Sequence, residues 1–142
     1  MHTLFFAANN NLGDNVSKIK KNAVFFSLGG IGYGIIELLW RRRTHWTMII
    51  AGGICFVIFS FVSDKFSRKN MLFKCSFCAV AITAVELIFG IIFNMIFNMK
   101  IWDYSRQPFN FLGQICPLYT FLWGVLSLLF LPLANVLNKR MK

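Results

Sequence analysis

The chain has 142 residues, of which 57% are hydrophobic and 14% are charged, and phenylalanine alone occurs 17 times. A soluble domain of this length could not remove so much apolar surface from water, so we expect one domain embedded in the lipid bilayer. The net charge of +10 comes from short basic clusters between apolar runs. That layout is typical of segments beside anionic lipid and argues against nucleic acid as a partner.

A transmembrane helix needs roughly 20 apolar residues to cross the hydrocarbon layer. Four segments meet or approach this length, at residues 22–40, 46–62, 71–97 and 118–137. We therefore predict an all-α, polytopic membrane protein whose transmembrane domain, residues 22–137, has four helices in two helical hairpins. Residues 1–21 are expected to be a cytoplasmic or interfacial segment, either continuing the first helix or forming a polar tail. Residues 138–142 are expected to be a basic cytoplasmic tail.

The positions of Lys and Arg predict the orientation of the spans. Most of the basic residues beside the spans fall on the side of the two termini, so both termini are expected in the cytoplasm. Arg41, Arg42, Arg43 and His45 lie on the opposite side. They are expected to line an outer mouth, where protein carboxylates or an anionic ligand would balance their charge.

Small and polar residues mark the faces along which these helices should pack, because lipid gives no hydrophobic preference for one apolar contact over another. In the first span, Gly30 and Gly34 have the four-residue spacing that permits close helix contact. In the third span, small and polar residues recur every three or four positions and so share one face. They are Cys75, Ala79, Thr83, Glu86, Gly90 and Asn94. This stripe is expected to face protein.

Two acids lie within predicted spans. An ionised carboxylate at the bilayer centre costs at least ~2.5 kcal/mol, so Glu86 is expected to face protein, water or a partner charge. It would bind a proton or cation, with Thr83 and Asn94 beside it on the helix, or serve only as a structural polar contact. Glu37 is the second candidate. It precedes Arg41 by four residues, a spacing that equally favours a simple ion pair.

The cysteine and histidine residues suggest little enzymatic chemistry. Cys75 and Cys78 have the spacing of a redox pair, so a membrane thiol oxidoreductase is an alternative, although both lie in an apolar helix where cysteine acts as a small hydrophobe. The sequence contains no phosphate-binding loop ending in Gly-Lys-Ser or Gly-Lys-Thr and only two histidines. We therefore expect that the protein has no ATPase activity, no metal site and no cofactor, and that it is not an enzyme.

The long connection between the third and fourth spans is expected to be an ordered cap. It combines aromatic residues suited to the membrane interface with hydrogen-bonding and turn-forming residues. Its candidate ligand-binding residues are Trp102, Asp103, Tyr104, Arg106 and Asn110. A rigid cap that binds no ligand is the alternative. The order of acid, loop with Trp, and Gly-x-Ile-Cys also occurs in both halves of the chain, as expected for two parallel hairpins.

Several short motifs carry a resemblance to a known family. They are Val85-Glu86-Leu87, Trp102-Asp103-Tyr104-Ser105, Pro108-Phe109-Asn110, Gly113, Ile115-Cys116 and Trp123-Gly124. Over about residues 85–125 the chain resembles the Putative ABC-transporter type IV family of bacterial membrane proteins. Its first half, with Glu37-Leu38-Leu39, His45-Trp46 and Ala51-Gly52-Gly53, is similar to the family's short members.

The resemblance implies a multi-pass protein of the bacterial cell membrane. It implies a small transport component, as a permease subunit, carrier or channel, with a possible separate ATPase subunit that would contact residues 63–70. The packing stripes favour a homo-oligomer. A non-catalytic membrane scaffold or accessory protein is the main alternative function.

Overall fold

The computed structural model describes residues 2–142, with side chains from residue 10 onward. Over that range the chain forms α1 (His2–Arg41), α2 (Trp46–Lys65), α3 (Met71–Phe89) and α4 (Pro117–Arg140), and α3 continues as a π-helical segment, η1 (Gly90–Ile96). One isolated β-bridge, between Phe111 and Ile115, lies in the loop before α4. The predicted all-α fold is confirmed.

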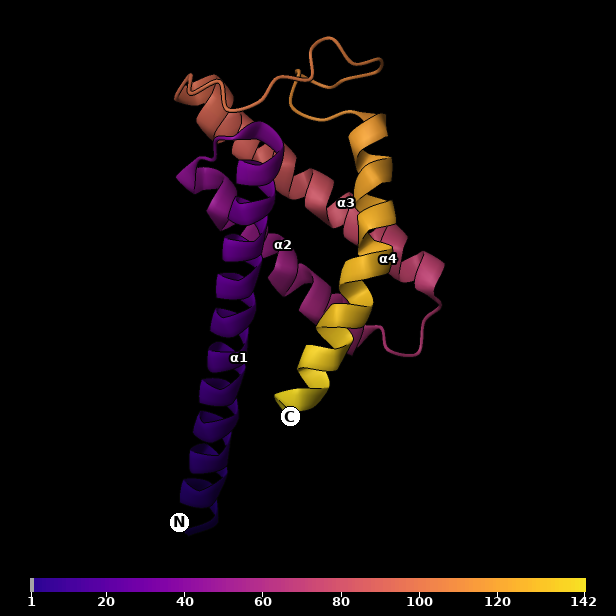
Figure 1. Cartoon of the computed structure of the whole chain (residues 1–142). Helices are drawn as coiled ribbons and strands as arrows, with labels where there is room; N and C mark the ends of the chain where they lie inside the picture. Colours follow the sequence, from indigo (N-terminus) through magenta and orange to yellow (C-terminus); the bar gives the residue numbers. More distant parts are fainter. Residues whose placement is uncertain (1) are drawn as a thin grey trace.

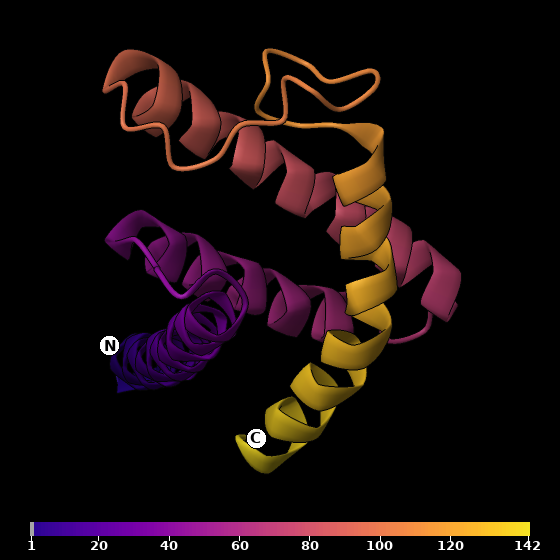
Figure 2. The same cartoon turned by 45° about the horizontal axis from the view of Figure 1, so that its top comes forward.

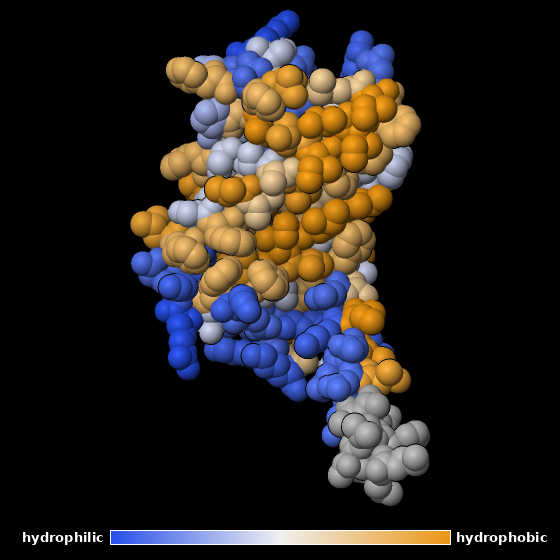
Figure 3. All heavy atoms as spheres, turned by 180° about the vertical axis from the view of Figure 1, so that it is seen from behind, coloured by the Kyte–Doolittle hydropathy of each residue, from blue (hydrophilic) through white to orange (hydrophobic). Residues whose placement is uncertain are grey.

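Four helical stretches of the described chain are long and apolar enough to cross a membrane. They are Asn10–Arg41, Trp46–Lys65, Met71–Ile96 and Pro117–Arg140. Large apolar side chains point outward from them, including Val80 at 67% and Leu129 at 69% exposure. Figure 3 shows apolar side chains across the middle of one face and hydrophilic side chains at both ends. This distribution is expected when hydrocarbon surrounds the middle of the protein.

The helices are arranged as two neighbouring pairs. α1 packs on α2, α3 packs on α4, and α2 also contacts both α3 and α4 (Figures 1 and 2). Within the described residues no Cα atoms of α1 and α4 lie within 8 Å of each other. α2 and α3 therefore lie at the centre of the arrangement, with α1 packed on α2 and α4 packed on both. One end of the bundle, the loop end, carries residues 42–45 and 97–116; the other, the terminal end, carries both chain termini (Figure 1).

The helix boundaries follow from local chemistry. His45 precedes α2, and its Nδ1 accepts a hydrogen bond from the Thr47 amide over 3.3 Å. Asn70 precedes α3, and its Oδ1 accepts from the Phe73 amide over 2.8 Å. Pro117 occupies the first turn of α4, where a missing amide hydrogen costs nothing. α1 continues through residues 10–21. Of the two alternatives for this segment, a polar tail or an extension of the first helix, the structure contains the extension.

Glycines set the close crossing of α1 and α2. A Cβ placed on Gly29 would lie 2.3 Å from Phe56 Cβ, and one on Gly52 would lie 2.4 Å from Tyr33 Cβ. A Cβ on Gly30 would lie 2.9 Å from the Ile49 carbonyl oxygen, whereas one on Gly34 would meet Ile49 at an ordinary 3.5 Å. The predicted role of the first span's glycines in packing is right, but the tightest contacts are at Gly29 and Gly52 and not at Gly34.

Polar contacts hold the terminal end together. Asp64 of α2 forms ion pairs with Lys21 of α1 and Lys142 at the chain's end. One turn earlier in α2, the Ser60 hydroxyl donates to Asn138 Oδ1 over 2.8 Å, and Asn138 Nδ2 donates to the Ser60 carbonyl over 3.1 Å. Ser60 and Asn138 are both buried. These pairs fix α1, α2 and α4 at the end of the bundle that is farthest from the loop.

Candidate functional site: a carboxylate in an interhelical cavity

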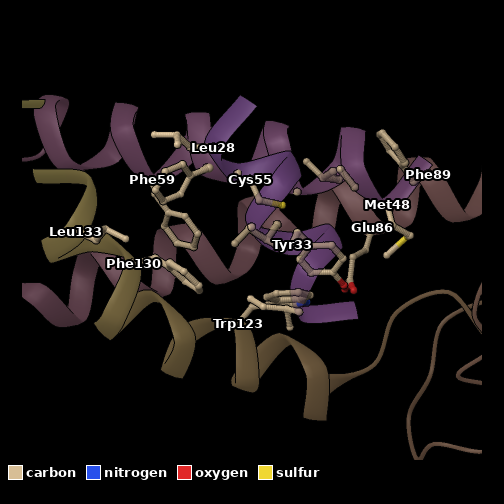
Figure 4. Close-up of a pocket in the computed structure, with 18 of the residues that line it drawn as sticks. Leu28, Tyr33, Met48, Cys55, Phe59, Glu86, Phe89, Trp123, Phe130 and Leu133 are labelled. Carbon is tan, nitrogen blue, oxygen red and sulfur yellow. The ribbon is translucent and has the colours of Figure 1, made fainter. Parts of the chain in front are cut away.

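A cavity of about 390 Å³ lies between the helices and receives side chains from all four of them. Apolar and aromatic groups make up most of its wall, and in the described chain Glu86 is the one acid that lines it. Figure 4 shows Tyr33 of α1, Cys55 of α2, Glu86 of α3 and Trp123 of α4 around the same space. The buried Trp102 of the loop also lines it. The volume falls in the usual range for small-molecule sites, roughly 300–1,000 Å³.

Glu86 meets polar groups from two other parts of the chain. The Tyr104 hydroxyl, from the loop, donates to Glu86 Oε1 over 3.4 Å, a long hydrogen bond. Trp123 of α4 lies beside the acid, and its buried Nε1 has no hydrogen-bond partner among the described residues. The carboxylate is partly buried and faces protein, as the stripe on the third span predicted. This arrangement places an acid and an indole N–H donor side by side at the wall of a mostly apolar cavity.

The stripe on α3 positions Glu86 by packing against α4. Cys75, Ala79, Gly90 and Asn94 are buried, and a Cβ on Gly124 of α4 would lie 3.6 Å from the Cβ of Ala79. Near Glu86, the hydroxyls of Thr83 and Thr120 are 2.9 Å apart and share a hydrogen bond across the two helices. Thr83 is therefore used in helix association, one turn from the acid.

Beyond Glu86 the helix changes to π-helical hydrogen bonding, which shifts its register. The Phe97 amide donates to the Ile92 carbonyl over 3.0 Å, five residues back. In this segment a Cβ on Gly90 would lie 2.5 Å from Gln114 Oε1, so glycine leaves room for the loop to pack on the helix. Single π-helical turns inside α-helices occur frequently at functional sites.

Asn94 of η1 binds the loop rather than the cavity. Its Nδ2 donates to Gln114 Oε1 over 2.9 Å and to the Trp102 carbonyl over 3.0 Å, and its Oδ1 accepts from the Ile101 amide over 2.7 Å. Trp102 Nε1 in turn donates to the Gln114 carbonyl over 3.1 Å. These buried bonds form a cap across the loop end of the cavity, as expected for an ordered loop.

The rest of the loop is organised by its polar residues. Asp103 Oδ1 accepts from the Ser105 amide over 2.8 Å, and this bond lowers the pKa of the Asp103 carboxyl. Asn110 Nδ2 donates to the Gln107 carbonyl, and Asn110 Oδ1 accepts from the Gly113 amide. Tyr104 stacks on Tyr119 of α4, with ring centroids 4.3 Å apart. Burial raises the pKa of the Tyr104 phenol, so this group stays a hydrogen-bond donor.

The basic residues at the loop end surround a separate cavity of about 180 Å³. Glu37 lies in its wall, where it pairs with Arg41 at 3.5 Å and accepts a hydrogen bond from Thr44 over 2.9 Å. The ion pair predicted from their four-residue spacing is thus present. Arg43, His45 and Lys100 also line this cavity.

The structure separates the predicted site residues into three groups. Glu86 and Trp102 line the interhelical cavity, and Tyr104 bonds to Glu86 from the loop. Glu37, Arg41, Arg43 and His45 gather at the loop end. Thr83, Asn94, Asp103 and Asn110 make hydrogen bonds within the fold. Arg42 has a φ of 57° and is exposed, as is Arg106.

Sequence reasoning missed three residues that matter to the geometry. Tyr33 and Trp123 lie next to each other in the wall of the interhelical cavity, with ring centroids 6.5 Å apart, and Gln114 bonds to Asn94. Trp123 and Gln114 stand within or beside the motifs that suggested the family, but nothing in their spacing relative to Glu86 predicts the contact.

The four thiols are free and belong to different environments. Cys55 lines the interhelical cavity, whereas Cys75, Cys78 and Cys116 are buried elsewhere in the fold. Among the residues that the structure describes, no three His, Cys, Asp or Glu side chains come together in a way that could hold a metal ion.

A comparison with family models extends the resemblance beyond the motifs. The family model described as Putative ABC-transporter type IV matches residues 23–141, a range that covers the loop, the last three spans and the second half of the first span. No curated protein and no solved structure matches the chain. The match covers more than half of the 142 residues, and the protein therefore belongs to the Putative ABC-transporter type IV family.

Proposed function

We propose that the protein is a small transport component of the membrane, a permease subunit, carrier or channel, in which Glu86 binds a proton or cation. The observation that carries the proposal is the position of the Glu86 carboxylate at the wall of a cavity that all four helices share. An ionisable residue at this depth is costly, and in membrane proteins such residues commonly mark ion or substrate pathways. Membership of a transporter family supports the same class of function.

The loop end would act as one gate of this pathway. Trp102 and Gln114 are held by Asn94 at the end of the cavity, and Tyr104 connects the loop to Glu86. Movement of the loop would therefore change the surroundings of the carboxylate. Glu37 is already paired with Arg41 and bonded by Thr44, so its proposed role is to hold the gate and not to bind cargo.

A separate ATPase subunit would dock at the terminal end, which we propose faces the cytoplasm. The turn between α2 and α3 exposes Ser67, Arg68, Lys69 and Asn70, and the ion pairs of Asp64 fix the helix that precedes it. Where an ATPase is encoded beside this gene, reversing the charge of Arg68 and Lys69 to Glu should weaken its co-purification with this chain. Arg140→Glu, at an exposed position on the same end, is the control. Equal losses in both variants would count against a specific contact at the turn.

Flux measurements in proteoliposomes test the proposed function. The purified chain is reconstituted, a proton or cation gradient is imposed, and internal pH is followed with a trapped dye. We expect Glu86→Gln to lower flux by an order of magnitude or more, because the amide keeps the size of the side chain but cannot ionise. Asp14→Asn removes one negative charge at an exposed position of α1 and should retain flux. Equal flux in wild type and Glu86→Gln would contradict the proposal and favour the scaffold.

A further inference from the structure

The interhelical cavity reaches the surface of the molecule between α1 and α4. Leu28 and Ile36 of α1 and Leu133 of α4 line it, and each of these side chains is about half exposed, at 46%, 51% and 48%. In the described chain no Cα atoms of α1 and α4 lie within 8 Å of each other, and the side chains of the two helices meet at the Tyr33–Trp123 pair. Both helices are membrane spans by length and composition. The open side of the cavity therefore faces the hydrocarbon of the bilayer.

Both ends of the bundle that meet water carry positive charge. Arg41, Arg42, Arg43 and Lys100 lie at the loop end, and α4 ends with Lys139 and Arg140 at the terminal end. A hydrophilic cation that approached through water would meet like charge at either end. A cation dissolved in the bilayer would instead reach the cavity from the side. The charge distribution thus favours a cargo that partitions into lipid.

The chemistry of the cavity wall also argues against an inorganic cation. In the described lining, side-chain oxygens come from Glu86 and Tyr33 alone. Hard cations such as Ca²⁺ take six to eight oxygen ligands. The wall supplies aromatic rings instead, since Tyr33 and Trp123 lie 6.5 Å apart at the level of Glu86, and Phe59 stacks on Phe130 with centroids 5.4 Å apart (Figure 4). Aromatic faces attract organic cations, and they also pack against apolar groups.

We propose that the cargo of this cavity is an amphipathic organic cation that enters from the bilayer between α1 and α4. Its positive group pairs with the Glu86 carboxylate beside Tyr33 and Trp123. Its apolar body lies along Phe130, Leu133 and Leu137 toward the terminal end. This inference rests on the proposed transport function and adds the class of substrate and its route of entry.

Binding of tetraphenylphosphonium to the full chain in phosphatidylcholine nanodiscs tests the charge preference. Equilibrium dialysis should give saturable binding to wild type, and tetraphenylborate, which has nearly the same shape and the opposite charge, should not bind saturably. Because Glu86→Gln removes the charge partner of the phosphonium, it should weaken phosphonium binding by at least about tenfold. Asp14→Asn should bind as wild type does. Circular dichroism establishes that each variant is folded.

A matched pair of variants on α4 tests the route of entry. Leu133→Trp fills the opening of the cavity without touching Glu86 and should reduce phosphonium binding. Leu129→Trp, at a lipid-exposed position of the same helix that does not line the cavity, should leave it unchanged. Equal binding by these two variants, or equal binding by wild type and Glu86→Gln, would overturn the proposal.

The outcomes also separate this inference from the proposed function. If folded wild type shows no saturable phosphonium binding but Glu86→Gln still abolishes ion flux, the class of cargo is wrong and the transport role stands. If phosphonium binds at Glu86 but wild type transports neither it nor protons above the level of empty liposomes, the cavity is a binding site and the transport role fails.

Discussion

Tyr104 and Glu86 connect the loop to the interior of the bundle, since the phenol donates to the carboxylate over 3.4 Å although the residues lie 18 positions apart. Tyr104 also stacks on Tyr119 with an interplanar angle of 10°. One aromatic side chain therefore joins the loop, α3 and α4. The position of the loop and the polarity around the acid depend on each other through this residue.

Replacing Tyr104 by Phe separates the hydrogen bond from the stacking. The ring contact with Tyr119 remains, but Glu86 loses a donor. Because the bond is long, the loss is expected to be about 1 kcal/mol or less, which corresponds to a reduction of flux by roughly two- to fivefold. Tyr119→Phe keeps the stack and the Tyr104 hydroxyl, so proteoliposome flux should be normal. A larger effect in Tyr119→Phe than in Tyr104→Phe would contradict this role for the hydroxyl.

The loop should lose order in acid through Asp103. The Ser105 amide bond lowers the pKa of this carboxyl below its unfolded value of about 3.9. A lowered folded pKa stabilises the loop at pH values above the unfolded pKa, and this contribution disappears as the pH falls through the folded pKa. The chemical shift of the Ser105 amide proton in nanodiscs should follow that transition. Asp103→Asn should abolish this pH-dependent change in chemical shift. A transition with its midpoint at or above about pH 3.9 in the wild type would contradict a lowered pKa for Asp103.

The crossing of α1 and α2 should not tolerate a methyl group at its closest points. Gly29→Ala would place a Cβ 2.3 Å from Phe56 Cβ, and Gly52→Ala would place one 2.4 Å from Tyr33 Cβ, so the helices must separate. Overpacking of this kind costs typically about 1–3 kcal/mol. Thermal unfolding in detergent measures the loss. Gly32→Ala has no atom within 4 Å of its new Cβ and should match or slightly exceed wild type. Equal stability of all three variants would show that the crossing is looser than described.

The polar pair at the terminal end should contribute to stability. Asn138→Ala removes two buried hydrogen bonds to Ser60 and leaves the Ser60 hydroxyl without its acceptor. Interhelical hydrogen bonds in membranes contribute about 0.6–2 kcal/mol, so a loss in that range is expected for this variant. Asn135→Ala, at an exposed position of the same helix, should have little effect. The same thermal unfolding assay compares them, and a smaller loss at Asn138 than at Asn135 would contradict the pairing.

The helices and the inward face of α3 could be predicted from the sequence because both follow from periodicity and the thickness of the bilayer. Glu86 and Gly90 share a face with Asn94 simply through their spacing of four residues. The pairing of Glu37 with Arg41 is equally local. Each of these predictions depends on contacts within one helix or on the cost of polar groups in lipid.

The remaining geometry depends on contacts between distant segments, and these leave little trace in one sequence. Ser60 and Asn138 are 78 positions apart, and each reads as an ordinary small or polar residue in a span. Sequence spacing does not predict the π-helical segment Gly90–Ile96, and within it Asn94 bonds to Trp102 and Gln114 of the loop instead of forming part of the expected ion site. The closest partner of Gly29 is Phe56 on another helix. Spacing within α1 alone pointed to Gly30 and Gly34 as the packing glycines, because it carries no information about the partner helix.

Chemical modification of Glu86 in the unmutated protein tests the central claim most directly. Dicyclohexylcarbodiimide is a lipid-soluble reagent that reacts with carboxyl groups in apolar surroundings, and peptide mass spectrometry gives the fraction of Glu86 modified. If this carboxylate binds the transported species, proteoliposome flux should fall in proportion to the fraction of Glu86 modified. Tetraphenylphosphonium should slow the modification of Glu86 and, with it, the loss of flux. Undiminished flux from protein that is fully modified at Glu86 would contradict the account.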